Sequence, residues 1–515
     1  MDVQRREFLK RAAFGGTCLA SSGRLSGTAA AGEKAARQDL PHAYTYRIAF
    51  GAWINDMRNE PLPLQDWPAP QLDDETIKSV VMAMNVQSEA GFNILDWWGL
   101  FATGSYPPDI DSVFNDAQRT RGVRRLFAEA TRRNMTMLFG LGLMSWGYDT
   151  IIRQDPQVAG RDRTGKPLPH AMCGAKEKSW QYVRKILDRA INDFPFAGVH
   201  LESADRGWCD CPECGGKDGT VAYNIRLNIR AADYIKRKWP GKIVTCIPIN
   251  WLNGTGQRYF NEKDKARLLD LSKHIDCFMD QGWRGQYIAE DGRRDFIKRL
   301  HCCYGTSADV RLYHSVRWDR SSYFLPYANR TGEAIKRHYA DGARACMFYQ
   351  GPVANPSTEV NIAVGGRILA DTTRDVEATL AEVIQRYYRP SKPAPHKKLI
   401  EIFGRAEEAY CSQWDPKAFL AHRGANSPWC GPPGEFYLNE ALFGDSPGPA
   451  TFLLEPYLNA EGRRRYKAGL MSILRDLSAI EDDFDDDGRI RRIQRGMIIT
   501  LNLINTIRAC KGETG

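Results

Sequence analysis

The sequence predicts an α/β protein, a (β/α)8 TIM barrel followed by a C-terminal helical domain. Apolar segments of strand length alternate with amphipathic helical segments from residue 45 to about 388, and this alternation repeats eight times. The residues after 388 show helical patterns only. Because no Gly-x-Gly-x-x-Gly turn follows the first predicted strand, a dinucleotide-binding sheet is disfavoured.

The predicted strands are short apolar segments, most of them followed by a predicted helix. The strands lie at 46–54, 92–99, 135–143, 197–203, 242–250, 275–280, 310–316 and 343–351. The helices between them lie at 73–91, 121–134, 176–193, 222–239, 264–272, 292–301 and 332–342. Regular alternation of this kind predicts parallel strands with helical crossovers, which defines a barrel domain over 45–388.

Three long helical patterns follow, in the region 389–515. The Pro/Gly-rich stretch ANSPWCGPPGEF, residues 425–436, separates the first of them from the other two. We expect this region to form a helical domain that packs on the barrel.

The first 31 residues have a different character from the rest. Arg5 and Arg6 precede a weakly apolar stretch from Ala12 to Ala20, and small residues follow at 28–31. This pattern resembles a twin-arginine export signal. The apolar stretch is shorter than the roughly 20 residues that a membrane span requires. We therefore expect a mature protein that begins near Gly32, works in the periplasm or outside the cell and has no stable membrane insertion.

The charge of the chain predicts a mixed, solvated surface. The net charge of +9 arises from 71 basic and 62 acidic residues spread along the whole length. No nucleic-acid-binding motif is present, so nucleic acid is not an expected partner. Basic groups at a pocket for an acidic substrate remain an alternative.

Aromatic and polar residues recur where the predicted strands end. In such barrels the loops that leave the carboxyl ends of the strands form the active face. Aromatic faces beside polar side chains suit a sugar ring, although core packing is the alternative for any single tryptophan. The candidate substrate-binding residues are Trp53, Asp96, Trp97, Trp98, Trp146, Asn250, Trp283, His314, Trp318 and Tyr349.

Carboxylates at strand ends are candidates for catalysis. Glu202 and Asp205 lie where the fourth strand runs into its loop, and Asp280 closes the sixth. Cleaving a glycosidic bond needs a protonated carboxylic acid and a second carboxylate. Glu202 or Asp205 suits the first role and Asp280 the second, with Asp319 and Glu359 as rivals. Helix capping or pairing with arginine is the structural alternative.

Four cysteines form a candidate metal site. Cys209, Cys211 and Cys214 lie in the segment HLESADRGWCDCPECGGK, which begins within the predicted strand 197–203. Cys173 lies just before the predicted helix 176–193, which precedes that strand. The long segment 144–175 is roomy enough to bring Cys173 to the other three. A structural zinc is the leading interpretation, with local disulfides and free thiols as alternatives. Catalytic zinc is disfavoured because such sites keep an open position, and no organic cofactor is predicted.

These same motifs resemble a known family. Met172, Cys173 and Gly174 before a helix, AGVHLESAD, RGWCDCPEC and the later segment 359–390 look like an exported bacterial family of TIM-barrel, glycoside-hydrolase-like proteins. That family is related to the α-glucuronidases and more distantly to the β-hexosaminidases. The resemblance covers roughly residues 45 to 390. It implies that Asp205 takes the acidic position, Trp208 the aromatic position, the four cysteines the cluster, and Tyr387 and Tyr388 the start of a helical tail.

The resulting prediction is a glycoside hydrolase that cleaves a complex polysaccharide, with uronic-acid-containing polymers as candidates. A non-catalytic carbohydrate-binding barrel is the alternative. A separation of about 5 to 10 Å between the carboxylate of Asp280 and that of Asp205 or Glu202 favours hydrolysis, and a wider gap favours binding. A metal-dependent lyase or oxidoreductase is a third hypothesis, and it requires metal ligands at the barrel mouth.

Overall fold

The fold is described from a computed structural model. It describes residues 41–51, 72–102, 104–215, 219–248, 251–252, 255, 257, 259–280, 286–307, 324–349, 353–411 and 460–513. The predicted signal segment lies outside these residues. Among the helices in these ranges, none has the length and apolar character that crossing a bilayer requires.

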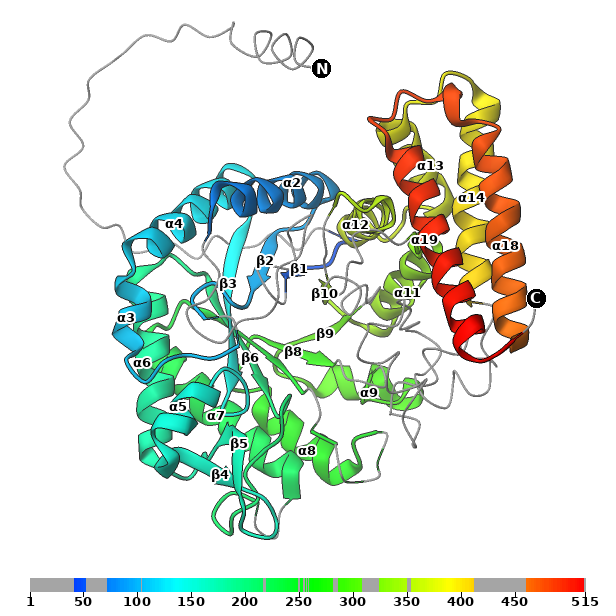
Figure 1. The fold of residues 1–515 in the computed structure, drawn as a ribbon. Helices are drawn as coiled ribbons and strands as arrows, with labels where there is room; N and C mark the ends of the chain where they lie inside the picture. Colours follow the sequence, from blue (N-terminus) through cyan, green and yellow to red (C-terminus); the bar gives the residue numbers. More distant parts are fainter. Residues whose placement is uncertain are drawn as a thin grey trace, which may run out of the picture. The chain divides into compact units, whose positions relative to one another are not determined.

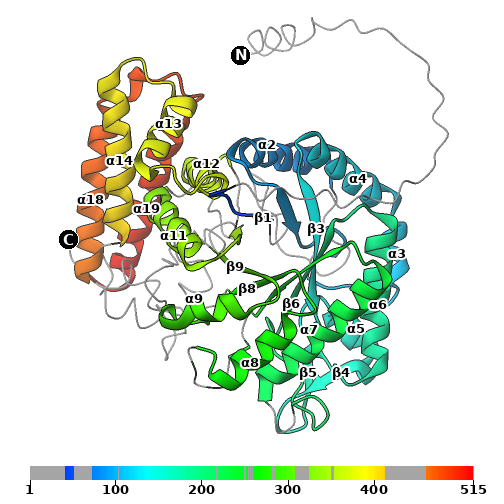
Figure 2. The same cartoon turned by 180° about the vertical axis from the view of Figure 1, so that it is seen from behind.

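Eight parallel strands close into a barrel, which confirms the predicted fold class (Figures 1 and 2). Their order around the barrel is β1-β10-β9-β8-β7-β6-β3-β2. The strands are β1 (Tyr46–Gly51), β2 (Ile94–Trp97), β3 (Thr136–Leu143), β6 (Gly198–Ser203), β7 (Ile243–Ile247), β8 (Cys277–Asp280), β9 (Cys303–Ser307) and β10 (Ala345–Tyr349).

Helices cover the outside of this barrel (Figure 1). Helix α2 shows why they form where they do: the Asp73 side chain accepts a hydrogen bond from the Thr76 N–H at its start, and Gly91 ends it in the left-handed region at φ 97°. The helices up to β10 are α2 (Asp74–Ala90), α3 (Ile110–Asn115), α4 (Ala117–Arg132), α5 (Asp149–Gln154), α6 (Glu177–Asp193), α7 (Gly219–Lys238), α8 (Glu262–Leu271), α9 (Glu290–Arg299) and α11 (Ala328–Asp341).

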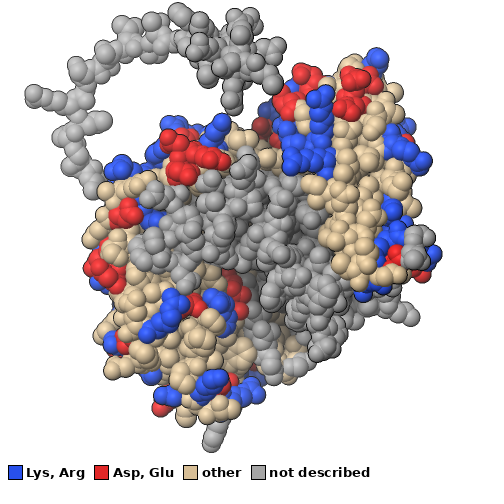
Figure 3. Space-filling view, viewed as in Figure 1, with Lys and Arg blue, Asp and Glu red and all other residues tan. Residues whose placement is uncertain are grey.

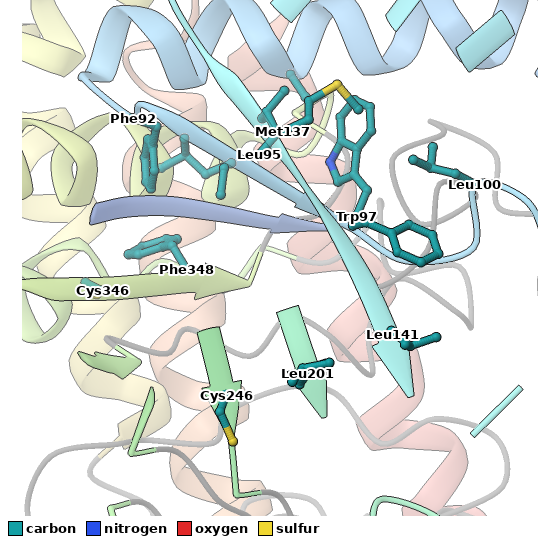
Figure 4. Close-up of a cluster of buried hydrophobic side chains, with 14 of the residues drawn as sticks. Phe92, Leu95, Trp97, Leu100, Met137, Leu141, Leu201, Cys246, Cys346 and Phe348 are labelled. Carbon is teal, nitrogen blue, oxygen red and sulfur yellow. The ribbon is translucent and has the colours of Figure 1, made fainter. Parts of the chain in front are cut away.

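Side chains along each strand alternate between the barrel interior and the surrounding helices. On β1, Ile48 and Phe50 belong to an inner apolar cluster, while Ala49 belongs to the outer one. Figure 4 shows part of the outer cluster, including Phe92, Leu95 and Phe348. Because of this alternation, only the residues on the inner face of a strand can point into the barrel mouth. The buried members of the inner cluster are Ile48, Phe50, Ile94, Trp98, Leu138, Ile247, Cys277, Met279, Ala345 and Met347.

The seventh barrel strand differs from the prediction. It is Cys303–Ser307, whereas the predicted segment 310–316 lies outside the described residues. The segment VRLYHSV is richer in β-branched and aromatic residues than CYGTS, so its composition favoured it. The observed strand fits the packing at this position, because its glycine leaves room for the neighbouring side chain. A Cβ atom on Gly305 would lie 2.2 Å from the Met279 sulfur. A short hairpin of β4 (Ala159–Arg161) and β5 (Pro167–Met172) was also not predicted.

Helices form the described chain after β10. The helices α13, α14, α18 and α19 lie side by side (Figures 1 and 2). The division of the chain at residue 388 stays a prediction. These elements are α12 (Pro356–Ala370), α13 (Val376–Tyr388), α14 (Pro393–Cys411), α18 (Ala460–Ser478) and α19 (Arg489–Cys510).

A buried ion pair joins α12 to α19. Arg489 donates from Nε and Nη2 to the two oxygens of Glu359, both at 2.7 Å, and the two side chains are 15% and 7% exposed. Because both carboxylate oxygens are occupied by this arginine, the structure gives Glu359 a structural role and removes it as a rival for catalysis.

We expect Arg489→Ala to destabilise the protein by about 3–5 kcal/mol, because it leaves a buried carboxylate without its partner. Urea denaturation measures the loss of unfolding free energy. Arg491→Ala is the matched control, since Arg491 lies on the same helix, is 80% exposed and pairs with Glu481 at the surface. Its loss should stay below about 1 kcal/mol. Equal effects of the two substitutions would contradict the assignment.

Glu407 of α14 caps a barrel helix. Its carboxylate accepts hydrogen bonds from the Asn329 and Arg330 backbone N–H groups, at 3.2 and 2.8 Å, in the first turn of α11. The Glu407 side chain is buried, and burial raises its pKa to about 7 from an ordinary value of 4.5. The folded protein therefore binds this proton more tightly than the unfolded chain does.

The contribution of the protonated Glu407 to the free energy of unfolding should be fully present below about pH 4.5 and lost as the pH rises through about 7. The free energy of unfolding should fall by on the order of 3 kcal/mol across this range. We expect Glu407→Gln to remove this dependence. Its melting temperature should rise relative to the wild type between pH 5 and pH 8. Glu408→Gln is the control because Glu408 is 65% exposed. A constant difference between wild type and Glu407→Gln across this range would contradict the raised pKa.

Candidate functional site

The carboxyl end of β6 carries two carboxyl groups. His200 and Glu202 lie on the inner face of the strand, because Val199 and Leu201 belong to the outer cluster. Glu202 is 5% exposed, and Asp205 is half-buried in the loop that follows. The chain turns between them: Ala204 has a φ of 67°, in the left-handed region. The two groups therefore occupy different surroundings within one short segment.

Supporting contacts hold the end of β6 in place. The Ser203 hydroxyl accepts hydrogen bonds from Trp251 Nε1 at 2.7 Å and from Asn228 Nδ2 at 2.9 Å. All three residues are buried. Sequence reasoning did not single out Ser203 or Asn228, since neither belongs to a recognisable motif.

Asp96 and His200 form a buried pair inside the barrel. The Asp96 carboxylate contacts His200 Nδ1, and neither side chain is exposed. Burial raises the pKa of Asp96, while the neighbouring His200 acts in the opposite direction. Asp96 was predicted to bind substrate, but with no exposure it lies beneath the site and contacts the strand that carries Glu202.

The predicted tryptophans separate into two groups. Trp98 belongs to the inner cluster and its ring packs edge-on against Trp146, with centroids 5.3 Å apart. Trp97 belongs to the outer cluster, 1% exposed, and lies beside Met137 (Figure 4). The predicted substrate-binding role of Trp97 is therefore wrong, because adjacent strand residues face opposite sides of the barrel wall.

Two glycines of β3 make the space for the inner tryptophans. A Cβ atom on Gly140 would lie 1.9 Å from the Trp98 ring, and one on Gly142 would lie 2.5 Å from Trp146 Cβ. The alternating glycines of MTMLFGLGL were a signal for this arrangement that sequence reasoning missed.

Asp280 does not face the barrel interior. Its strand neighbours Cys277 and Met279 are inner residues, so Asp280 lies on the outer face with Phe278. Its two oxygens accept hydrogen bonds from the backbone N–H groups of Tyr287 and Ile288, at 2.7 and 3.0 Å, and from the Tyr304 hydroxyl at 2.6 Å. These contacts give Asp280 a structural role, and its position does not support the predicted catalytic one.

Tyr349 is the remaining candidate substrate-binding residue that lies among the described residues. Tyr349 ends β10 in register with Phe50. The candidates outside the described residues are Trp53, Asn250, Trp283, His314, Trp318 and Asp319.

A cluster of charged residues lies beside Asp205. The half-exposed Arg206 side chain donates from Nη1 to both Asp149 oxygens at 3.4 Å, and His170 Nδ1 contacts the same carboxylate. Asp149 opens α5, and His170 lies on β5. The loop of Asp205 is thereby joined to the segment between β3 and α6. On the face seen in Figure 3, acidic and basic side chains are interspersed, as predicted for the surface.

The four cysteines meet as predicted. Cys173, Cys209, Cys211 and Cys214 are buried, and their sulfur atoms all lie within 4.8 Å of one another. Cys173 Sγ is 3.5 Å from that of Cys214 and 3.8 Å from that of Cys211. Bonds of about 2.3 Å from a central zinc would hold tetrahedral sulfurs about 3.8 Å apart, whereas disulfide-bonded sulfurs lie about 2.05 Å apart. The residues therefore fit a metal ion, and none of the four forms a disulfide in this structure.

The electrostatics of the cluster also suit a cation. Hydrogen bonds with the thiols of Cys209 and Cys214 lower the pKa of Cys173, and the same sharing of protons raises the pKa of Cys214. The backbone N–H of Arg161 donates to Cys209 Sγ at 3.3 Å, which ties the β4–β5 hairpin to the cluster. A cation would replace the shared protons and balance the charge of the thiolates.

No protein-family profile matches the sequence, and no curated protein matches it. Among solved structures, a GH138 enzyme targeting pectin rhamnogalacturonan II is similar over 91% of this chain and 72% of its own, at a TM-score of 0.53 and 11% identity. CpGH84B and CpGH84D also match over 91% of this chain and 69% and 66% of their own, with TM-scores of 0.45 and 0.44 and identities of 9% and 8%. The likeness to the GH138 enzyme establishes a shared fold.

Proposed function

We propose that the protein is a glycoside hydrolase that cleaves a polysaccharide through the carboxyl groups of Glu202 and Asp205. The observation that carries the proposal is the pair of carboxyl groups at one strand end, with Glu202 buried on the inner face and Asp205 half-buried in the loop. Burial favours the protonated form of a carboxyl group, which the proton donor requires. We therefore assign proton donation to Glu202 and the role of second carboxylate to Asp205.

The surroundings of the two acids support a carbohydrate substrate. Trp98 and Trp146 provide aromatic surface on the same side of the barrel wall as Glu202. The GH138 neighbour, which shares the fold, targets a pectin polysaccharide. We propose a complex polysaccharide as the substrate class, with acidic polymers included because the exposed Arg206 directly follows Asp205.

The four-cysteine cluster enters this proposal as a structural zinc site. The metal would join the segment that carries Cys173 to the loop that carries Asp205, without contact to the substrate. The N-terminal pattern supports export by the twin-arginine route, which would place the reaction in the periplasm or outside the cell.

The proposal is tested by incubating the wild-type protein and Asp205→Asn with a panel of plant, algal and animal polysaccharides and measuring released sugar. Release by the wild type alone is expected. If neither protein releases sugar but one polysaccharide binds, the protein is a non-catalytic carbohydrate-binding barrel. Equal release by both proteins would remove Asp205 from the reaction.

A further inference from the structure

Two buried aspartates of the barrel wall have different hydrogen bonding. Asp280 is fully engaged, with both oxygens accepting from the loop and from Tyr304. Asp96 is equally buried, yet within the described structure its Oδ1 has no hydrogen-bond partner, and neither does Nε2 of its partner His200. A buried polar group without a hydrogen-bond partner destabilises the folded state, so a purely structural role does not account for the Asp96–His200 pair.

A third unmet polar atom lies next to this pair. Thr245 on β7 is the register partner of His200 on β6, and both residues are on the inner face of the barrel. The Thr245 hydroxyl is buried and also has no hydrogen-bond partner in the part of the chain that the structure describes. Open polar atoms on β2, β6 and β7 thus lie on the inner face of the barrel wall, where His200 contacts Asp96 and is the register partner of Thr245. Buried polar atoms without a partner call for an explanation beyond packing.

The imidazole ring of His200 is held in a fixed orientation. Asp96 contacts Nδ1, and the rings of Phe50 and Trp98 pack against the imidazole with centroids 5.7 and 6.1 Å away. Nε2 is therefore the nitrogen left for other contacts. Glu202 follows two residues later on the same face, about 7 Å along the strand toward the mouth, a distance that two side chains can bridge.

We propose that His200 is a positioning residue of the active site, which Asp96 orients through Nδ1 and which acts on the Glu202 carboxyl group through Nε2. This inference rests on the proposed function. In it, Nδ1–H donates to Asp96, and the unprotonated Nε2 accepts a hydrogen bond from a water that Thr245 holds. The same water donates its second hydrogen to the carbonyl oxygen of the Glu202 carboxyl group, which orients that group while its own proton stays free for the leaving oxygen. Asp96 and Thr245 contribute by fixing the histidine and the water.

Two substitutions of His200 separate this role from a structural one. His200→Asn retains a polar atom where Nδ1 contacts Asp96 but has nothing at the place of Nε2, whereas His200→Gln places a polar atom near Nε2. We expect Gln to retain at least tenfold more kcat than Asn on the polysaccharide that the wild type cleaves, with similar KM values. Asn retaining as much kcat as Gln, or more, would overturn the proposal.

A second measurement tests the orientation of His200 without an assay of activity. The protein has nine histidines, so long-range ¹H–¹⁵N spectra of histidine-labelled protein can resolve the His200 nitrogens, assigned by comparison with His200→Gln. We expect Nδ1 to carry the proton and Nε2 to be unprotonated, and Asp96→Asn to reverse this order. A proton on Nε2 in the wild type would overturn the proposal. If the wild type releases no sugar, the proposed function fails, while these spectra still report on the Asp96–His200 pair.

Discussion

Glu202→Gln is expected to lower kcat on the natural polysaccharide by about 10²- to 10⁴-fold, with little change in melting temperature. Glutamine has the shape of the protonated acid but cannot donate the proton that the leaving oxygen requires. The substitution leaves β6 and its supporting contacts to Trp251 and Asn228 unchanged. The expected loss is therefore chemical and not structural.

The leaving group tests the assigned role. An aryl glycoside with an acidic phenol needs little protonation to depart, so its cleavage by Glu202→Gln should fall much less than cleavage of the polysaccharide. Asp280→Asn is the matched control, because Asp280 is buried on the outer face of the wall. It should lower stability while the folded protein retains its kcat. An equal loss for both substrates in Glu202→Gln would assign Glu202 a role other than proton donation.

The class of fold was predictable because it depends on regular alternation, which the sequence displays over more than 300 residues. The exact strand was not predictable at β9. Composition alone favours the segment VRLYHSV, which is richer in β-forming residues than CYGTS. The observed strand instead depends on its pairing with β8 and β10 and on the space that Gly305 leaves for Met279. Such constraints come from neighbours distant in the sequence.

The direction of side chains was harder to predict than the position of strands. Period-two alternation places His200 and Glu202 on one face of β6, but it does not indicate which face is the inner one. In strands that are buried on both faces, such as Cys277–Asp280, apolar residues occupy both sides and give no sign of orientation. Asp280 and Trp97 were misassigned for this reason.

The cysteine cluster was predictable from chemistry, because a Cys-x-Cys-x-x-Cys loop supplies three ligands and a tetrahedral zinc site needs a fourth, which Cys173 can provide. The contact of Asp149 with Arg206 and His170 was not predictable, because charged residues of this kind are common on solvated surfaces. Both features join the same two parts of the chain, the segment between β3 and α6 and the loop after β6. The geometry of Asp205 therefore depends on both of them.

Cys211→Ser is expected to remove a bound zinc ion and to destabilise the protein by on the order of 4 kcal/mol or more, because a structural metal contributes its binding energy to folding. Elemental analysis of the wild type should find one zinc per chain. The substitution should also lower kcat, since the cluster holds the loop that carries Asp205.

Cys510→Ser is the control for this substitution, because Cys510 is exposed and lies outside the cluster; it should leave metal content and melting temperature unchanged. Removing the metal with a chelator should reproduce the effect of Cys211→Ser in the wild type and add nothing in the variant, since both act on one site. Thiol titration of the unfolded protein, with and without a reductant, separates this outcome from disulfides. If the cysteines bind a metal, the number of titrated thiols should be the same with and without the reductant. A rise of two or four thiols on reduction would indicate disulfides and contradict the metal site. Normal melting of Cys211→Ser would also contradict it.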